Sequence, residues 1–165
     1  MTLMETLYDE HEKIAAFIET LQQKCVALME HGTFNAQEFH DAIRHIREYA
    51  DKGHHQKEER LLFRAMVKEL GPAAENLVQH GMLVEHDMAR LTVSELEKAV
   101  QAYEETKSAD AKLDVLAHTM EYVYLLRRHI AKENGAVYPF AERNLKPETM
   151  QKLEEDFQAG RSFEG

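Results

Sequence analysis

The sequence predicts an all-α protein folded as an up-down-up-down four-helix bundle with a short C-terminal helix. Three observations favour this fold class. The good helix formers Ala, Leu, Glu, Lys, Gln and Met dominate the 165 residues, whereas the chain has only 3 prolines and 7 glycines. Turn-forming residues divide the chain into four long intervals and a tail. Within the intervals, apolar residues recur near the helical period, as expected for helices that share one core.

The first two helices have recognisable starts. Thr2 and Glu5 fit a capping box, and so do Asn35 and Glu38. Gly32 suits the left-handed residue that ends many helices, so the first helix is predicted to stop there. The apolar positions that would face the core are Leu3, Leu7, Ile14, Leu21 and Leu28 in the first helix and Phe39, Ile43, Ile46, Ala50, Leu61 and Ala65 in the second.

The remaining boundaries follow from glycine, proline and polar residues. Gly71 is predicted to end the second helix in a left-handed conformation, and Pro72 to open the third, since proline is favoured in the first helical turn. A turn near residues 106–108 separates the third helix from the fourth. Short loops make consecutive helices antiparallel neighbours. We therefore assign residues 1–145 to the bundle and residues 146–165 to a short helix and tail that pack outside it.

Composition excludes several classes of partner. A net charge of -10 without a cluster of Lys or Arg would repel a phosphate backbone, so we expect no nucleic acid partner. No apolar run approaches the ~20 residues that a membrane span needs, and the first residues do not form a secretory signal. We expect a cytoplasmic protein. The lone cysteine, Cys25, is predicted to pack in the core.

A repeat becomes visible when the sequence is shifted by 75 residues. The shift places Glu10-His11 on Glu85-His86, His54 on His129, Lys57 on Lys132 and Glu58 on Glu133. Each His-x-x-x-Glu motif thus follows a Glu-His pair, with 43 residues between the corresponding histidines. By contrast, His55 falls on Ile130 and Glu59 on Asn134. His55 and Glu59 are therefore predicted to lie toward a flank or solvent, and the two lysines are expected to be solvated.

The repeated residues are predicted to meet in one layer of the bundle. His11 and His54 each lie about 20 residues from the first turn, or ~30 Å along a helix, and His86 and His129 stand in the same relation to the third turn. Residues four apart share a helical face. Burying such polar groups unpaired costs several kcal/mol each. We predict that two cations satisfy them, bound by His11, His54, Glu58, His86, His129 and Glu133. This ligand type suits iron, and the spacing is also compatible with manganese or zinc.

This pattern resembles that of the hemerythrin-like, or HHE cation-binding, family over nearly the whole chain. Supporting stretches run from Tyr49 to Phe63, from Glu85 to Arg90, and through LLRRHIAKENGAVYPFAER. The resemblance implies an up-down-up-down bundle that holds two non-haem iron ions, joined by an oxo or hydroxo bridge and two carboxylates. Myohemerythrin is a related protein with such a bundle.

The ligand pattern is closer to a symmetric four-histidine branch than to the oxygen-carrying members. Those members have five histidines, whereas Met82 and Arg90 occupy the positions four residues to either side of His86. The implied functions are binding or sensing of O₂ or NO, or holding iron. The alternatives are a di-iron redox enzyme acting on peroxide, O₂ or NO, an iron-sulfur cluster repair-type protein, and an iron-dependent interaction module. The sequence does not separate these functions.

Four further residues have weaker predicted roles. His80 is an outer-shell candidate, and His118 is expected one layer away from the site or at the bundle end. Tyr122 lies on the same stripe as the fourth-helix ligands and is interpreted first as a packing residue, with hydrogen bonding to a ligand as the alternative. Gly53 lowers helix propensity next to a predicted ligand, so we expect it to admit a bulge or a small molecule there.

Overall fold

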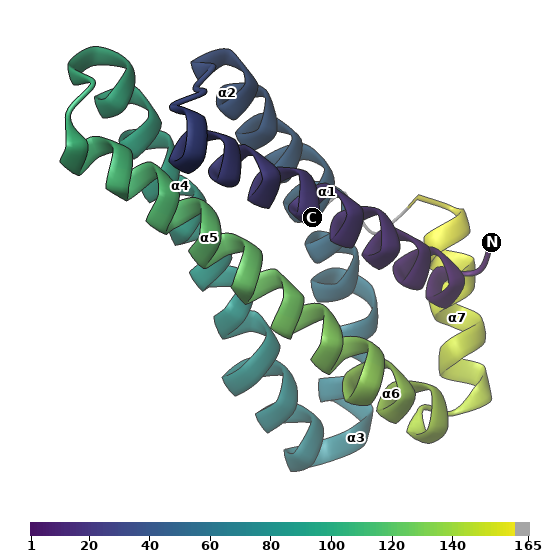
Figure 1. Cartoon of the computed structure of the whole chain (residues 1–165). Coiled ribbons are helices and arrows are strands. Elements are labelled where there is room, and N and C mark those ends of the chain that lie inside the picture. The colour runs from purple at the N-terminus through teal and green to yellow at the C-terminus, as the bar shows by residue number, and fades with distance from the viewer. Residues whose placement is uncertain (161–165) are drawn as a thin grey trace.

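Four long helical arms and a short final helix make up the chain in a computed structural model, which describes residues 1–160 (Figure 1). The first arm is α1 (Leu3–His31). The second contains α2 (Ala36–His45), the π-helical segments η1 (Ile46–His55) and η2 (Glu58–Leu62), and the start of α3 (Phe63–Leu77). The third continues through η3 (Val78–Met82) and α4 (Leu83–Thr106), and the fourth contains α5 (Ala109–Lys132), η4 (Glu133–Val137) and α6 (Tyr138–Asn144). The predicted four-helix bundle is confirmed.

The start and end of α1 follow the sequence prediction. The Thr2 hydroxyl accepts a hydrogen bond from the backbone N–H of Glu5 at 3.2 Å, and the Glu5 carboxylate accepts one from the backbone N–H of Thr2 at 2.8 Å. Gly32 ends the helix with φ 67° and ψ 13°, in the left-handed region. Both features satisfy backbone groups that a helix end leaves unpaired.

The second capping box forms only in part. The Asn35 side chain accepts hydrogen bonds from two backbone N–H groups of α2, as a capping residue should. The Glu38 carboxylate instead pairs with the ammonium group of Lys24 at 2.8 Å. Asn35 alone therefore caps α2.

Gly71 separates the second arm from the third. Its φ of 73° and ψ of -157° lie in a region that is nearly restricted to glycine, so the backbone breaks here and the next arm starts at Pro72, as predicted. The conformation is not the left-handed helical one that we predicted, because the chain reverses at this residue without a C-terminal helical cap.

The π-helical segments surround the middle of the bundle. A π-helix uses hydrogen bonds from residue i to i+5 and so places an additional residue in each turn. The bulge predicted at Gly53 is confirmed, since Gly53 lies inside η1. A Cβ atom at this position would lie 3.2 Å from the carbonyl oxygen of Glu48, five residues earlier, so the absence of a side chain eases the wide turn.

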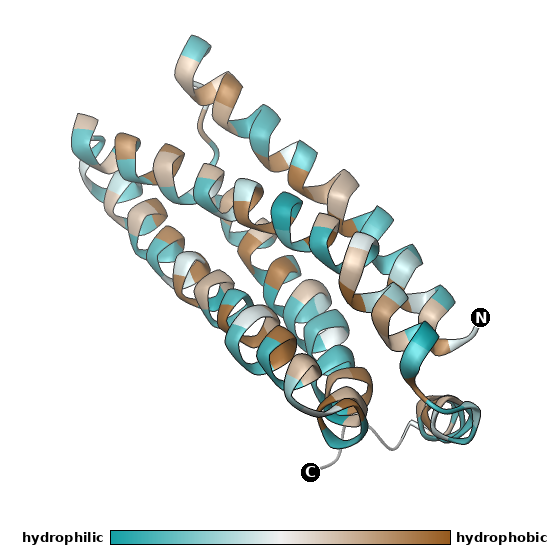
Figure 2. Ribbon diagram, turned by 90° about the horizontal axis from the view of Figure 1, so that it is seen from below, coloured by the Kyte–Doolittle hydropathy of each residue, from teal (hydrophilic) through white to brown (hydrophobic). Residues whose placement is uncertain are grey.

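Two apolar clusters divide the core along the bundle axis. One contains Ile14, Ala50, Ala89 and Leu126, and the other contains Leu7, Leu61, Met82 and Val137. Between these pairs, each arm contributes one or more buried histidines or glutamates, and together these side chains form a polar layer. Figure 2 shows that hydrophilic and hydrophobic residues alternate around the turns of the helices, as expected for amphipathic helices that share a core.

The short C-terminal helix α7 (Pro147–Gln158) lies near the start of α1 (Figure 1). Leu153 is buried, and the Glu154 carboxylate accepts a hydrogen bond from the backbone N–H of Leu3 at 2.7 Å. The predicted short C-terminal helix is confirmed, while residues 161–165 of the predicted tail lie outside the described part of the chain. None of the helices in residues 1–160 combines the length and apolarity that crossing a bilayer requires. Cys25 is buried, as predicted.

Candidate metal centre

The six predicted ligands lie together in the polar layer between the two apolar clusters. They come from α1, η1, η2, α4, α5 and η4, and each is no more than 2% exposed: His11, His54, Glu58, His86, His129 and Glu133. The layer thus draws on all four arms. Burial of this many polar side chains requires partners that offset their lost hydration.

Glu58 directs its two carboxylate oxygens to different sides of the layer. Its Oε1 lies 3.6 Å from Nε2 of His54, and its Oε2 lies 3.3 Å from Nε2 of His86. Because His54 belongs to the first half of the chain and His86 to the second, the Glu58 carboxylate spans both halves of the site.

Glu133 has the equivalent arrangement. Its Oε2 lies 3.0 Å from Nε2 of His11, and its Oε1 lies 3.1 Å from Nε2 of His129. The Nε2 atoms of His86 and His129 are also only 3.2 Å apart, so two imidazole nitrogens converge on one point. Each carboxylate therefore contacts both sides of the layer with a different oxygen.

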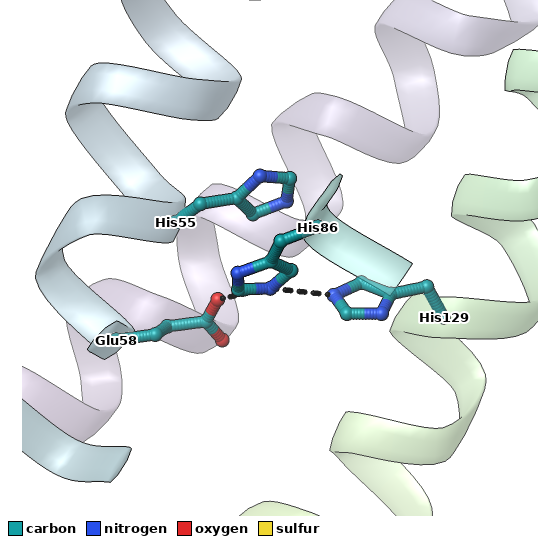
Figure 3. Close-up of side chains that lie close together, drawn as sticks. All are labelled: His55, Glu58, His86 and His129. Carbon is teal, nitrogen blue, oxygen red and sulfur yellow. Dashed lines mark hydrogen bonds and ion pairs between the residues drawn. The ribbon is translucent and has the colours of Figure 1, made fainter. Parts of the chain in front are cut away.

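These atoms form two neighbouring sets that could each hold a metal ion. One set contains His11, His54, Glu58 and Glu133, and the other contains His55, Glu58, His86 and His129, with the ligand atoms of each set within 4.8 Å of one another. Figure 3 shows the second set, in which His55, His86 and His129 gather beside the Glu58 carboxylate. The Glu133 contact to His129 brings its Oε1 to this second set as well.

Carboxylates outside the layer orient two of the imidazoles. Nδ1 of His54 lies 2.9 Å from a Glu10 oxygen, and Nδ1 of His129 lies 2.8 Å from a Glu85 oxygen. A partner on Nδ1 leaves Nε2 directed into the layer. The repeated Glu-His pairs of the sequence therefore place a supporting carboxylate next to each of two candidate ligands.

Two lysines complete these supporting contacts. Lys57 pairs with Glu10, and Lys132 pairs with Glu85. Lys57 is only 8% exposed, so the prediction that it is solvated is wrong, because its ammonium group turns back to the partly buried Glu10 carboxylate. The Lys132 side chain remains 51% exposed.

The imidazoles of His11 and His86 are supported by the residues that directly follow Glu133 and Glu58 in the sequence. Nδ1 of His11 lies 2.6 Å from Oδ1 of Asn134, and Nδ1 of His86 lies 2.7 Å from Oε1 of Glu59. Glu59 also accepts a hydrogen bond from Arg90 at 2.7 Å. Glu59 is 26% exposed and so lies at the flank of the bundle, as predicted, yet it supports His86 from there as Asn134 supports His11.

His55 is a second correction. It was predicted to lie toward a flank or solvent, but it is 3% exposed and its ring stacks on that of His86, with centroids 3.9 Å apart (Figure 3). The cause is η1, whose wide turn brings His54 and His55 into the interior together. Burial and the neighbouring His86 lower the pKa of His55 to about 3, so its ring is neutral and able to bind a cation.

Tyr138 is a site residue that the sequence prediction missed. Its hydroxyl donates a hydrogen bond to Oε1 of Glu58 and lies 3.2 Å from Nε2 of His11, and its ring stacks on that of His11. Tyr138 falls on Phe63 in the 75-residue repeat, a pairing that extends the sequence match without indicating a role in the site. The repeat gave no signal for it, because its counterpart Phe63 has no polar group.

Three weaker candidates lie outside the ligand sets. His80 is exposed, so its predicted outer-shell role is wrong. His118, as predicted, lies away from the site, where its Nδ1 is 3.2 Å from Glu121. Tyr122 is 1% exposed and makes no hydrogen bond to the predicted ligands among the described residues, but it lines a cavity together with His55.

The electrostatics of the layer reflect strong mutual attraction. Burial alone would raise the pKa of the Glu133 carboxyl, but His129, His11 and His86 outweigh burial and hold it well below its usual range. Burial alone would lower the pKa of His129, but Glu133 and Glu85 raise it to about 9. The carboxylates therefore favour positive charge in the layer, whether protons or metal ions supply it.

Unpartnered atoms show that the layer fits a metal centre. The buried side-chain atoms without a hydrogen-bond partner in the described chain are Nε2 of His54, both ring nitrogens of His55, Oε2 of Glu58, both carboxylate oxygens of Glu133 and, outside the site, Oε1 of Gln22. Buried polar atoms are rarely left unpaired. Nearly all the exceptions here are nitrogen and oxygen atoms of the two ligand sets, as expected where cations take the place of hydrogen-bond donors.

The fold and this layer define the chain as a cation-binding helical bundle with imidazole and carboxylate ligands. Residues 2–141 match the family model of the Hemerythrin HHE cation binding domain. Because the match covers most of the chain, the protein belongs to this family. No curated protein matches the chain.

Proposed function

We propose that the chain is a non-haem di-iron protein that binds or senses O₂ or NO, or holds iron, at the polar layer. One observation carries the proposal. Glu58 and Glu133 each direct one oxygen toward each ligand set, which is the arrangement that two carboxylates need to bridge a pair of ions. The related hemerythrin-like pattern of the sequence supports iron as the metal.

The two proposed ions have different imidazole ligands. His11 and His54 would hold one ion, and His86 and His129 would hold the other. His55 would add a third imidazole to the second ion, which extends the ligand set predicted from the repeat. Mixed imidazole and carboxylate ligands with open positions suit redox-active iron, although manganese or zinc could occupy the same donors. Iron would supply reversible electron transfer and an open position for a small ligand.

The protein residues around the ligands keep them oriented and dry. Glu10, Glu59, Glu85 and Asn134 hold the Nδ1 atoms, so the Nε2 atoms face inward. The two apolar clusters close the layer from both ends of the bundle. A small apolar molecule such as O₂ or NO would therefore meet the metals in a site that excludes bulk water.

A redox enzyme acting on peroxide, O₂ or NO is the second candidate. It is favoured by Tyr138, whose hydroxyl contacts Glu58 and His11 inside the layer. A phenol in this position can hold or deliver a proton next to a bound small molecule.

Metal analysis of the reconstituted protein tests the metal centre. We expect the wild-type protein to hold two iron ions per chain after anaerobic loading. A variant carrying both Glu58→Ala and Glu133→Ala should hold fewer than two, because no carboxylate would remain to bridge the two ligand sets. Glu155→Ala changes an exposed glutamate of α7 and serves as the control, with wild-type loading. Full loading of the double variant, or exclusive binding of zinc, would contradict the proposal.

Reaction with small molecules separates the two candidates. The anaerobic di-ferrous protein is mixed with stoichiometric O₂, NO or peroxide and followed by absorption spectroscopy. A long-lived adduct without loss of the added molecule supports a binding or sensing protein. Repeated consumption of peroxide, or of O₂ or NO when a chemical reductant is supplied in excess, that slows in Tyr138→Phe supports the enzyme.

A further inference from the structure

A cavity lies directly beside the candidate metal centre. It has a volume of about 240 Å³ and is lined by residues of η1, α4 and α5. His55 lies at its inner side, and the partly exposed side chains of Arg47 and Arg90 lie at its rim. A diatomic molecule occupies about the volume of one water molecule in the liquid, ~30 Å³. The cavity is therefore several times larger than O₂ or NO requires.

Two buried polar side chains in the cavity lack protein partners. His55 is 3% exposed, and neither of its ring nitrogens makes a hydrogen bond. Its Nδ1 lies 3.8 Å from Oδ1 of Asp51, beyond hydrogen-bonding distance. Tyr122 is 1% exposed, and its hydroxyl has no hydrogen bond to any residue in 1–160. Since buried polar atoms are normally paired, the two His55 nitrogens indicate a ligand with a polar group at its inner end, and the Tyr122 hydroxyl lines the same cavity without a protein partner.

One of the three cations at the cavity has no carboxylate partner in the part of the chain that the structure describes. Arg47 is neutralised by two hydrogen bonds to the Glu97 carboxylate, at 3.0 and 2.6 Å. Arg90 is likewise paired with three carboxylates, those of Asp51, Glu59 and Asp87, at 2.8, 2.7 and 3.0 Å. Lys52 is exposed and lines the cavity without an ion pair to any residue that the structure describes. Its ammonium group is thus available to a negatively charged ligand.

The remaining walls are apolar. Ile46, Ala89 and Val93 line the space between the rim and the inner polar groups. All three are no more than 4% exposed, so they would gain contacts with the body of a ligand rather than with water. Binding pockets of this kind combine mostly apolar walls with a few polar groups that fix orientation.

We propose that the cavity between η1, α4 and α5 binds a small organic carboxylate with a hydrogen-bonding group at its opposite end. The carboxylate pairs with Lys52, the body packs on Ile46, Ala89 and Val93, and the inner group meets Tyr122 and His55. The inference depends on the proposed function in one respect only, namely that metal ions lie next to the bound carboxylate. Binding itself requires no iron.

Calorimetric titration of the full chain tests the proposal, with 4-hydroxybenzoate as the probe. The protein is used both metal-free and loaded with zinc, which is redox-silent. We expect one molecule to bind per chain in both forms. Benzoate, which lacks the inner hydroxyl, and 4-hydroxybenzyl alcohol, which lacks the charge, should each bind about tenfold more weakly, as expected for losing one charge-assisted or buried hydrogen bond.

Two variants connect binding to the cavity. Lys52→Gln should weaken binding about tenfold, whereas Lys112→Gln, at a lysine of α5 outside the cavity, should leave it unchanged. Ala89→Leu should fill the space and abolish binding while two zinc ions still load, which verifies that the bundle remains folded.

Several outcomes would overturn the proposal. The first is that 4-hydroxybenzoate gives no binding heat with folded protein, and the second is that Lys52→Gln binds it as tightly as wild type. The third is that azide competes with 4-hydroxybenzoate and does so only in the zinc-loaded protein, which would place the probe on the metal. Failure to load two zinc ions counts against the metal centre alone, because binding to the metal-free protein would still support the cavity.

Discussion

At the scale of single residues, each of the four repeated histidines has a supporting partner on Nδ1, and Glu59 offers the clearest test. Its carboxylate accepts from His86 and from Arg90, and so fixes one imidazole of the second ligand set. Loss of such supporting partners commonly lowers metal affinity 10- to 100-fold. We expect Glu59→Ala to lower the affinity for one of the two metal ions by roughly that factor. Competition with a chelator measures the affinity. Glu48→Ala, at an exposed glutamate of η1, should bind like wild type, and equal affinities in the two variants would show that Glu59 has no supporting role.

Asp51 makes a prediction about acid stability. Burial alone would raise its pKa, but the contacts with His55 and Arg90 outweigh burial and lower it to about 2. A carboxyl whose pKa is lower in the folded than in the unfolded chain, where it is about 3.9, stabilises the fold above that value and loses this effect as pH falls toward 2. In metal-free protein, Asp51→Asn should therefore reduce the free energy of unfolding by about 1 to 2 kcal/mol at pH 6.

The pH dependence of this difference is the decisive measurement. Urea unfolding of wild type and Asp51→Asn between pH 6 and pH 2.5 should show the two stabilities converging below about pH 4. A difference that stayed constant over this range would mean that the Asp51 charge does not stabilise the fold.

At the scale of elements, the π-helical segments determine which side chains reach the layer. Replacing a helical glycine by alanine usually stabilises a helix by about 1 kcal/mol. At Gly53 the new Cβ would lie only 3.2 Å from the Glu48 carbonyl oxygen, whereas at Gly81 of η3 the nearest atom is 3.8 Å away. We expect Gly81→Ala to stabilise the protein and Gly53→Ala to give no gain or a loss of up to about 1 kcal/mol. Thermal unfolding measures both, and an equal gain would show that η1 tolerates the side chain.

The same segments explain which parts of the site the sequence could predict. The 75-residue repeat identified the six inner residues because it compares positions directly and needs no assumption about helical pitch. The exclusion of His55 and Glu59 relied on the same repeat, which places them on Ile130 and Asn134, but the wide turn of η1 buries His55 and Glu59 supports His86 from outside the layer. Tyr138 was missed for a related reason, since it reaches Glu58 from another arm and no repeat relates the two.

At the scale of the whole molecule, the two halves are similar but not equivalent. The repeat preserves the inner ligands, yet it places Glu59 opposite Asn134, His55 opposite Ile130 and Phe63 opposite Tyr138. The fold was predictable because capping residues, Gly71 and the apolar stripes all indicate the same four arms. The difference in chemistry between the two ligand sets was not predictable, because it depends on contacts between side chains of different arms.

The metal ions should also stabilise the whole bundle. Without them, the layer keeps buried carboxylate and imidazole atoms unpartnered at its centre, between the two apolar clusters. A ligand that binds only the folded chain adds about 4 kcal/mol at a concentration a thousand times its dissociation constant. We therefore expect the melting temperature to rise on loading with zinc or ferrous iron and to fall on treatment with a chelator. The variant carrying both Glu58→Ala and Glu133→Ala should melt at a temperature that added metal changes little, while Glu155→Ala should respond as wild type. If wild type and the double variant gained the same stability from metal, the ions would be binding elsewhere, and the polar layer would be a hydrogen-bonded core without a metal centre.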